Sequence, residues 1–459
     1  MNSVQVDKVE PLNIEIPTVK ESSITKQFPQ RFNKNAIRTT LQASTVDAVF
    51  ASIFSLTSGG ILLSHFLVEL DASPVIFGML SSIPMVVNLI QPIGAYISEQ
   101  TTSRFQFSLV TFGISRLLWL ILVVGIFANN HPSIINSQQL LILTLSVVLC
   151  SHLLGGLGSA SWLSWLAIIV PRKLRGRYFG IRNTASNLTN LICIPVAGLV
   201  ISNWYGGTIQ GYGLVLSCGI VCGIISLICQ SFKIDINPQL QNQHDLNLST
   251  NLTEDISPKA GDEINNIWGN ANFLIFLIYF SLWMFAVHLS APFFNLYLLS
   301  TLDLDVTLVT IYSTFQTGAN LLMLMIWGKL ADKIGNRPIL IGVGILIAIT
   351  PLLWLGISNH QLDLWLWLPL LHILAGTTWA AIDLCTTNMY LGLAPVRNQS
   401  IYFAIAAAVA GVSGFLGTTI GGFIAQIPQL GGLLGLFALS SLCRLIGLIP
   451  LIFVQEPGK

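Results

Sequence analysis

The amino-acid sequence predicts an all-α integral membrane protein with twelve transmembrane helices in two pseudo-symmetric six-helix halves. Three observations support this fold class: an apolar composition, twelve apolar runs, and a strict bias in where basic residues fall. Hydrophobic residues make up 53% of the 459 residues and charged residues only 9%, whereas an ordinary soluble domain has roughly 25% charged residues. A soluble protein has too little interior to bury this much apolar surface, so we expect a bilayer around the chain.

Each apolar run is long enough to cross a bilayer, which takes about 20 mostly apolar residues. The expected spans are residues 44–68, 74–98, 106–128, 138–169, 178–203, 211–231, 271–298, 306–327, 338–358, 364–390, 399–426 and 431–454. The fourth run is long, and we expect it to end in an interfacial turn around Trp162 and Trp165.

The basic residues predict the orientation of these spans. With the N-terminus placed in the cytoplasm, 18 of the 21 Lys and Arg fall in cytoplasmic segments, and the expected outer loops carry only acidic and neutral residues. The 18 are six in the N-terminal tail (Lys8 to Arg38), Arg104, Arg172, Lys173, Arg175, Arg177, Lys233, Lys259, Lys329, Lys333, Arg337, Arg397 and Lys459. Because Lys and Arg are retained on the cytoplasmic face during insertion, we expect a multi-pass protein of the cell membrane with both termini in the cytoplasm.

Polar segments divide the chain. Residues 1–42 carry mixed charges without the apolar core of a signal peptide, which predicts a disordered cytoplasmic tail. Residues 232–269 are rich in Asn, Gln, Asp and Ser and predict a cytoplasmic linker. The linker separates an N-terminal half, residues 43–231, from a C-terminal half, residues 270–455. The seven cysteines all lie in apolar runs without metal-ligand spacing, so we expect neither a metal site nor a disulfide.

The two halves repeat each other in sequence. Three sets of residues recur in the same order: Pro171, Tyr178, Phe179 and Ile181 as Pro395, Tyr402, Phe403 and Ile405; His152, Gly156 and Ala160 as His372, Gly376 and Ala380; and Gly94 as Gly328. Three such matches at equivalent spans indicate an internal duplication. Duplicated halves around a linker are typical of transporters whose halves move about a site at the bilayer midplane.

The loop after the eighth run, from Gly328 to Leu340, carries the most specific motif: Gly328-Lys-Leu-Ala-Asp332-Lys333-Ile-Gly335-Asn-Arg337-Pro-Ile-Leu340. Its residues predict a tight turn. Gly328 permits a close helix approach, Gly335 permits a positive φ angle, and Asp332 is suited to accept from backbone donors at a helix start.

This loop closely resembles the signature loop of the major facilitator superfamily (MFS). With the twelve spans and the repeat, the resemblance covers residues 44 to 454. It implies the MFS fold and a gating latch formed by Gly328, Asp332, Lys333, Gly335 and Arg337, in which Asp332 caps a helix and Asp332 and Arg337 hold the halves together on the cytoplasmic side. The alternative is a topogenic turn that only joins two helices.

The first half departs from the pattern. Ser98 stands where the Asp is expected and Thr101 where the second Gly is expected. Glu99 with Arg104 is the candidate substitute. The basic turn from Pro171 to Gly180 also resembles the family's loop between helices four and five, and it suits either a latch contact or retention on the cytoplasmic face.

A second family-like pattern starts at His152 and continues with Gly156 and Ala160; the family often carries Arg at its first position. A histidine there titrates near neutral pH, which predicts a proton-linked site. The alternative is a packed neutral histidine bonded to a backbone carbonyl, and the departure from Arg favours it.

Ionisable residues inside a bilayer are expensive and are usually paired or face water. Arg116 and Arg444 lie near the middle of the third and twelfth runs, and Asp47 and Asp383 are the intramembrane carboxylates, one in each half. We therefore expect the pairs Asp47–Arg116 and Asp383–Arg444. These are either coupling groups that take up a proton or substrate, or static structural pairs.

In the family, the first, fourth, seventh and tenth helices line the cavity. Besides Asp47, His152 and Asp383, the resemblance therefore implies as lining residues Trp162, Trp283, His288, Asn295 and Trp379. This mixture of aromatic rings and amides suits a small polar or amphipathic organic solute.

Together these patterns predict a secondary active transporter, symporter or antiporter, of a small organic solute, working by alternating access and driven by a proton, another ion or the solute gradient. We expect a monomer without cofactor or catalytic residues, since no phosphate-cradling loop and no nucleophile–base pair is present. The sequence has no basic face of the kind that would predict nucleic-acid binding. The alternatives are a non-transporting solute sensor or assembly factor with the same fold and, more distantly, an intramembrane enzyme.

Overall fold

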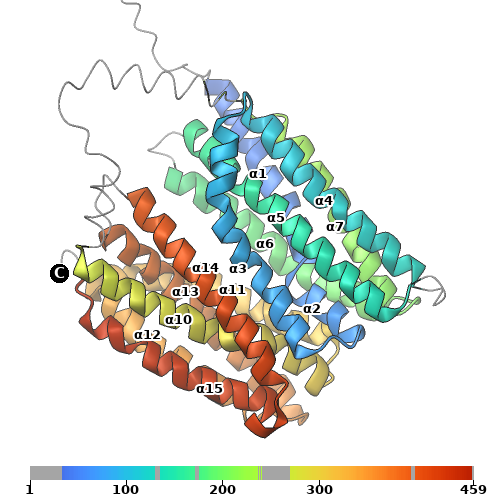
Figure 1. The fold of residues 1–459 in the computed structure, drawn as a ribbon, viewed down its shortest axis with the longest axis vertical. Helices are drawn as coiled ribbons and strands as arrows, with labels where there is room; N and C mark the ends of the chain where they lie inside the picture. The colour runs from blue at the N-terminus through green and yellow to red at the C-terminus, as the bar shows by residue number, and fades with distance from the viewer. Residues whose placement is uncertain are drawn as a thin grey trace, which may run out of the picture.

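The computed structural model describes residues 34–129, 135–170, 175–235, 237, 239, 269–393 and 399–456. This described part of the chain is built from helices joined by short turns, and it contains no strand. Figure 1 shows the helices running side by side along one common direction. The main helices are α1 (Lys34–Thr57), α2 (Gly60–Glu69), α3 (Pro74–Glu99), α4 (Arg104–Ala128), α5 (Ser137–Ile169), α6 (Arg175–Ser202), α7 (Thr208–Gln230), α10 (Ala271–Leu296), α11 (Val306–Ile334), α12 (Asn336–Ile349), α13 (Leu368–Leu393), α14 (Gln399–Ala425) and α15 (Gly432–Gly447).

These helices account for the twelve predicted spans. Helices α1 and α2 form one interrupted span, and eleven spans of the described chain are long and apolar enough to cross a membrane. Helix α11 supplies the twelfth; it is 29 residues long but carries several polar residues, including Thr310, Gln316 and Asn320. Short π and 3-10 segments extend four spans at their ends: Tyr297–Thr301, Thr350–Trp354, Asp363–Trp367 and Ile449–Phe453.

The chain forms two six-span bundles that lie against each other, one blue to green and one yellow to red in Figure 1. Both bundles begin and end at the same end of the molecule. We call the end that holds Lys34, Asn272 and Gln455 the basal end, and the end that holds Glu69 and Asp303 the distal end. Asn272 and Gln455 bond to each other at the basal end, with Asn272 Nδ2 2.7 Å from the Gln455 carbonyl oxygen.

One predicted boundary is wrong. Helix α1 begins at Lys34, inside the segment 1–42 that was expected to be a disordered tail, and the Thr39 and Thr45 hydroxyls donate to the carbonyls of Asn35 and Leu41, one turn earlier in this helix. Residues 1–33, and residues 240–268 of the predicted linker, lie outside the described part of the chain.

The backbone repeats between the halves at the distal turns. Asp71, between α2 and α3, and Asp303, before α11, are the non-glycine residues with positive φ in the described chain, at 55° and 50°. Each follows a leucine that ends a helix, Leu70 and Leu302. An unusual left-handed residue at equivalent points of both halves supports the predicted internal duplication.

Among the described residues, buried apolar side chains join the halves at one end only. A single large cluster at the distal end contains Phe66 and Tyr212 of the first half together with Phe293, Leu296 and Val306 of the second. Toward the basal end each half has a cluster of its own: one runs from Phe273 to Val454, the other centres on Leu166, Val170 and Tyr178. In the described chain the halves therefore share a core distally and not basally.

Glycines bring the halves together in the same region. A Cβ atom on Gly78 of α3 would lie 2.5 Å from the Thr418 carbonyl oxygen and 3.2 Å from Gly422 Cα, both on α14. Gly198 of α6 is covered by the side chain of Thr310 on α11. One turn farther along, Ser202 Oγ and Thr307 Oγ1 are 2.7 Å apart. Such small residues permit close backbone approach, which stabilises helix packing in lipid.

Candidate transport site

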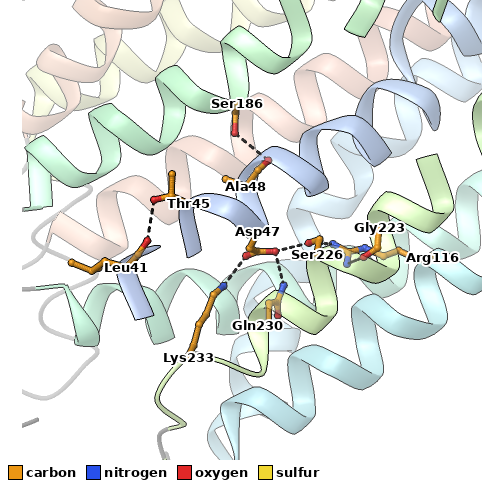
Figure 2. A network of polar contacts seen from close by, with 10 residues as sticks. All are labelled: Leu41, Thr45, Asp47, Ala48, Arg116, Ser186, Gly223, Ser226, Gln230 and Lys233. Carbon is orange, nitrogen blue, oxygen red and sulfur yellow. Dashed lines mark hydrogen bonds and ion pairs between the residues drawn. The ribbon is translucent and has the colours of Figure 1, made fainter. Parts of the chain in front are cut away.

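A buried charge network lies in the N-terminal half, where α1 meets the end of α7 (Figure 2). Asp47 is only 1% exposed, and its carboxylate accepts from Lys233 Nζ at 2.7 Å. Ser226 Oγ and Gln230 Nε2 donate to the same carboxylate. Burial lowers the pKa of the Lys233 ammonium, and the charge of Asp47 opposes that shift. Both oxygens of this carboxylate therefore accept hydrogen bonds, one of them from a cation.

The predicted direct pair between Asp47 and Arg116 is therefore wrong. Arg116 donates to the Gly223 carbonyl and, at 3.2 Å, to Ser226 Oγ, so it reaches Asp47 only through Ser226 (Figure 2). The physical reason is depth: Asp47 lies near the basal end, within reach of Lys233, which folds back after α7 ends at Gln230.

Trp162 belongs to the same basal region. The guanidinium carbon of Arg182 lies 4.6 Å from its ring centroid and Lys233 Nζ lies 5.4 Å from it. Cation–π contacts of this kind hold basic groups beside an aromatic face. The structure thus places this predicted cavity residue against the charges around Asp47.

The C-terminal half contains a buried arginine without a carboxylate partner among the described residues. Arg444 on α15 is 3% exposed. It donates to the Ile347 carbonyl at 3.0 Å and to Ser290 Oγ at 2.9 Å, with a longer contact of 3.5 Å to the Val287 carbonyl. The predicted Asp383–Arg444 pair is wrong, because Asp383 lies on α13 and neither hydrogen bond nor ion pair joins the two side chains.

A cavity of about 240 Å³ opens beside Arg444, inside the C-terminal half. Helices α10, α11, α12, α13 and α15 and the segment Thr350–Trp354 line it. Asn295 and Trp379, two of the predicted cavity residues, contribute to its wall. Its further polar side chains are Gln316, Thr350, His372, Thr378 and Arg444, and its further aromatic rings are Phe294 and Trp354.

The repeated histidines occupy equivalent positions. His152 Nδ1 lies 2.9 Å from the Val148 carbonyl oxygen, and His372 Nδ1 lies 2.8 Å from that of Leu368, each one turn back in its helix. A carbonyl accepts only, so each Nδ1 carries a proton, and in the neutral form of each ring Nε2 is an acceptor. The geometry agrees with the packed, carbonyl-bonded alternative for His152. Gly156 and Gly376, four residues on, closely approach α3 and α11 respectively.

Asp383 differs from Asp47 in its surroundings. Its side chain is exposed, and within the described part of the chain its carboxylate has no hydrogen bond or ion pair. It follows Trp379 by four residues, about one helical turn toward the basal end. Asp383 therefore lies on the same face of α13 as the cavity residue Trp379.

The other two predicted cavity residues lie elsewhere. Trp283 is 1% exposed and packs in the C-terminal core, with its ring centroid 6.2 Å from that of Tyr279. His288 lies beside α14, where its ring and Cβ are the near neighbours of Gly414 and Gly417. Trp283 is therefore a packing residue in this conformation.

The basal loop keeps part of its predicted geometry. Gly335 has φ = 98°, which confirms the predicted positive-φ turn. A Cβ atom on Gly328 would meet only Leu384 Cδ2 at 3.9 Å, so the predicted close approach there is wrong in this conformation. The Asp332 carboxylate has no bond to any described residue, and Arg337 Nη2 donates to the Ile452 carbonyl of its own half.

Glu456, not Asp332, accepts the backbone donors at the start of α12. Its carboxylate takes the Asn336 amide N–H at 2.7 Å, the Arg337 amide N–H at 3.1 Å and Asn336 Nδ2 at 2.8 Å. An anion at a helix N-terminus satisfies free N–H groups and interacts favourably with the helix dipole.

We expect Glu456→Ala to lower the free energy of unfolding by about 0.5–2 kcal/mol, the usual cost of losing a helix cap. Gln455→Ala is the matched control, since Gln455 bonds through its backbone to Asn272. Unfolding in detergent, followed by circular dichroism, measures both variants. Equal stability of the two would contradict a capping role for Glu456.

The first-half counterpart of this loop is built differently. Ser98, at the position of the missing Asp, is buried and donates to Ser161 Oγ at 2.5 Å across to α5. The side chain of Glu99 and the basic residues Arg172, Lys173, Arg175 and Arg177 lie outside what the structure describes. Their predicted roles therefore stay predictions.

Acidic residues of both halves line a second cavity, of about 730 Å³, at the distal end. Glu69 and Asp71 come from the first half and Asp303 and Asp305 from the second. His65 Nε2 lies 3.3 Å from Glu69 Oε1. The described side chains contain no group of three or more acidic, His or Cys residues arranged to hold a metal ion.

Sequence reasoning missed several residues of these sites. Ser226, Gln230 and Lys233 were not connected with Asp47, although the spacing of Ser226 and Gln230 places them on one face of α7 and Lys233 follows the end of that helix. Their positions at the edge of an apolar run were the available signal. Gln316, Trp354 and Thr378 gave no signal, because only the packing of several helices brings them to one cavity.

Two packed six-span bundles, a shared distal core and a polar cavity among the helices give the chain the architecture of a multi-pass membrane transporter of small solutes. The chain belongs to the MFS_1 like family, whose model matches residues 52–431. None of the curated proteins matches the chain.

Solved transporter structures share the fold at low sequence identity. A D-xylose-proton symporter is similar with a TM-score of 0.67 and 15% identity, over 92% of this chain and 98% of that chain. A mutant form of the nucleoside transporter NupG has a TM-score of 0.66 and 11% identity, over 91% and 100%. A bacterial homologue of the iron transporter ferroportin has a TM-score of 0.64 and 11% identity, over 91% and 98%.

Proposed function

We propose that this protein is a secondary active transporter that moves a small organic solute by alternating access. We further propose that it lies in the cell membrane with its basal end facing the cytoplasm. The observation that carries the proposal is the one-sided joining of the halves. They share a core and glycine contacts at the distal end, whereas the described basal clusters are separate. A shared core at the distal end alone supports a conformation that is closed distally, and we infer that this conformation opens toward the basal, cytoplasmic side.

The proposed orientation follows the basic residues. Lys233, Lys329, Lys333 and Arg337 all lie at or near the basal end, whereas the distal turns carry Glu69, Asp71, Asp303 and Asp305. The positive-inside rule then makes the basal end cytoplasmic. In this orientation residues 232–269 are a cytoplasmic linker between halves 43–231 and 270–455.

We expect the gating latch to form in the outward-open state, when the basal end is closed. With the basal end open, Asp332 has no partner in the described chain, as a latch should when released. In the outward-open state, Asp332 and Arg337, with Lys333 beside them, would hold the halves together basally. The Gly335 turn sets the position of this loop.

Asp383 is the proposed coupling carboxylate. Asp47 is occupied by Lys233, Ser226 and Gln230, whereas Asp383 is exposed, unpaired within the described residues and one turn from the cavity. A free carboxylate inside a membrane bundle marks an ion or proton pathway. Asp47, Arg116 and Lys233 are then the structural charge group, and Asp383 binds the proton during the cycle.

The test begins with a thermal-shift screen of purified protein against a mixed solute library, because a ligand of the folded state raises its melting temperature by mass action. Hits are then tested for uptake into proteoliposomes. We expect Asp332→Asn to retain the thermal shift and to lose at least about tenfold in flux, which corresponds to about 1.4 kcal/mol. Lys329→Gln, which changes a neighbouring charge, is the control.

Each outcome separates the candidates. Wild-type flux that falls in Asp332→Asn but not in Lys329→Gln supports alternating access with this latch. Binding without flux in the wild type would overturn the transporter proposal and leave a solute sensor. Asp383→Asn is expected to abolish proton-driven accumulation of the solute. Unchanged accumulation in this variant would contradict the proposed proton site.

A further inference from the structure

We propose that the cavity in the C-terminal half binds the carboxylate of a small organic acid at Arg444, which makes organic anions the substrate class. The inference rests on the proposed function, since it names what that transporter carries. It stands on three features of the described residues: a buried cation without a counter-ion, unpartnered polar groups around it, and a small cavity with aromatic walls.

Arg444 carries a positive charge that no acidic side chain of the described chain neutralises. Its guanidinium donates only to carbonyls and to the Ser290 hydroxyl, and its Nε has no hydrogen-bond partner among the described residues. A buried charge is costly unless an opposite charge compensates it. A residue that keeps such a charge within a membrane bundle is suited to bind an anion.

Arg116 in the N-terminal half is a buried arginine that does have a nearby carboxylate. Both arginines are buried, and both donate to a backbone carbonyl and a serine hydroxyl. In the N-terminal half, that serine, Ser226, passes the contact on to the Asp47 carboxylate. In the C-terminal half, Ser290 shares its bond with Ser440 at 2.9 Å, and no carboxylate of the described chain follows. The counter-ion present in one half is absent from the described residues of the other.

Around Arg444 the cavity offers polar side chains whose hydrogen-bonding capacity is wholly or partly unused within the described chain. The amide side chains of Asn295 and Gln316 line the cavity, and neither has a partner among the described residues. His372 keeps Nε2 as an acceptor because Nδ1 donates to Leu368. The Thr378 hydroxyl donates to the Leu374 carbonyl at 2.8 Å and retains acceptor capacity. These groups suit a carboxylate that also carries a hydroxyl or amine.

Size and wall chemistry limit the ligand further. The cavity of about 240 Å³ is smaller than the roughly 300–1,000 Å³ of pockets for drug-sized ligands. Phe294, Trp354 and Trp379 supply apolar wall on which a carbon skeleton packs. The fit is to a short organic acid.

The experiment compares matched probes on the purified, full-length wild type. Lactate, pyruvate and succinate are titrated beside their neutral amides, and thermal shift and equilibrium binding are measured. We expect the carboxylates to stabilise the protein and the amides to bind at least about 30-fold more weakly, since breaking a buried charged hydrogen bond costs about 2 kcal/mol or more. Equal binding of acids and amides would overturn the proposal.

Variants locate the site. Arg444→Met, which keeps volume and removes the charge, is expected to raise the dissociation constant for the best carboxylate at least about 30-fold. Asn295→Leu and Gln316→Leu, at partly buried positions, are expected to raise it more modestly and provide the test if Arg444→Met does not fold. Gln426→Leu, an exposed position outside the cavity, is the control with a matched change of side chain. Wild-type affinity in the three cavity variants would overturn the site.

The two proposals fail separately. Carboxylate binding that depends on Arg444 without any flux keeps the binding site and rejects the transporter. Flux of a neutral solute with no carboxylate binding keeps the transporter and rejects the anion site.

Discussion

Asp47→Ala is expected to lower the free energy of unfolding by about 3–5 kcal/mol, the largest stability loss of any single change considered for this protein. The substitution leaves the Lys233 ammonium buried without a counter-ion and removes the acceptor of Ser226 and Gln230. Arg116 also loses the negative charge that it reaches through Ser226. Unfolding in detergent, followed by tryptophan fluorescence or circular dichroism, measures the loss.

The double variant Asp47→Ala with Lys233→Met is the control for this interpretation. Removing both charges abolishes the uncompensated ammonium, so the double variant should recover most of the lost stability. A double variant as unstable as Asp47→Ala would contradict the pair and place the loss elsewhere.

The pH dependence of Asp47→Ala provides an independent check. Burial already lowers the pKa of Lys233 below its ordinary value of 10.5, and removing Asp47 removes the charge that raises it. Between the folded and unfolded pKa values the unfolded chain binds the additional proton, so stability rises with pH. We therefore expect the single variant to regain stability as the pH rises toward 10.5, and the double variant to lack this gain.

Gly78→Ala is expected to reduce flux strongly by preventing distal closure. The new Cβ atom would lie 2.5 Å from the Thr418 carbonyl oxygen and 3.2 Å from Gly422 Cα, and neither backbone atom can move as a side chain would. Overpacking of this kind costs about 1–3 kcal/mol, which shifts a two-state equilibrium about 5- to 150-fold toward the distally open form.

Gly342→Ala is the matched control, because a Cβ atom there meets no atom within 4 Å. The readout is the rate at which a cysteine introduced by Ser300→Cys, in the distal cavity, reacts with a membrane-impermeant thiol reagent added from outside. We expect faster labelling and lower flux in Gly78→Ala. Labelling and flux equal to those of Gly342→Ala would reject the role of this contact in closure.

The fold could be predicted from the sequence because hydrophobic run length and basic-residue bias are local signals. The repeat was also readable, since His152 and His372 recur with Gly156 and Gly376; the structure gives both histidines the same bond to a carbonyl one turn back, and each glycine lies close to a neighbouring helix. The Gly335 turn was predictable because only glycine readily adopts its φ of 98°.

The partners of buried charges could not be predicted in the same way. Asp47 pairs with Lys233, 186 residues away, because the chain folds back after α7. Arg444 was expected to have a carboxylate partner, and the described helices give it only neutral acceptors. Helical rotation and depth decide such pairs, and both depend on the packing of every helix in the bundle. The same reason separates Trp379, which lines the cavity, from Trp283, which packs in the core.

The most direct test of the account measures two distances between the halves by electron spin resonance in lipid. One label pair is distal, Tyr205→Cys with Leu430→Cys, and the other is basal, Gln106→Cys with Ile334→Cys; all four side chains are exposed. Alternating access predicts two populations in which a longer distal distance accompanies a shorter basal one, with ligand changing their ratio. If each label pair instead shows a single distance that ligand does not change, alternating access is contradicted.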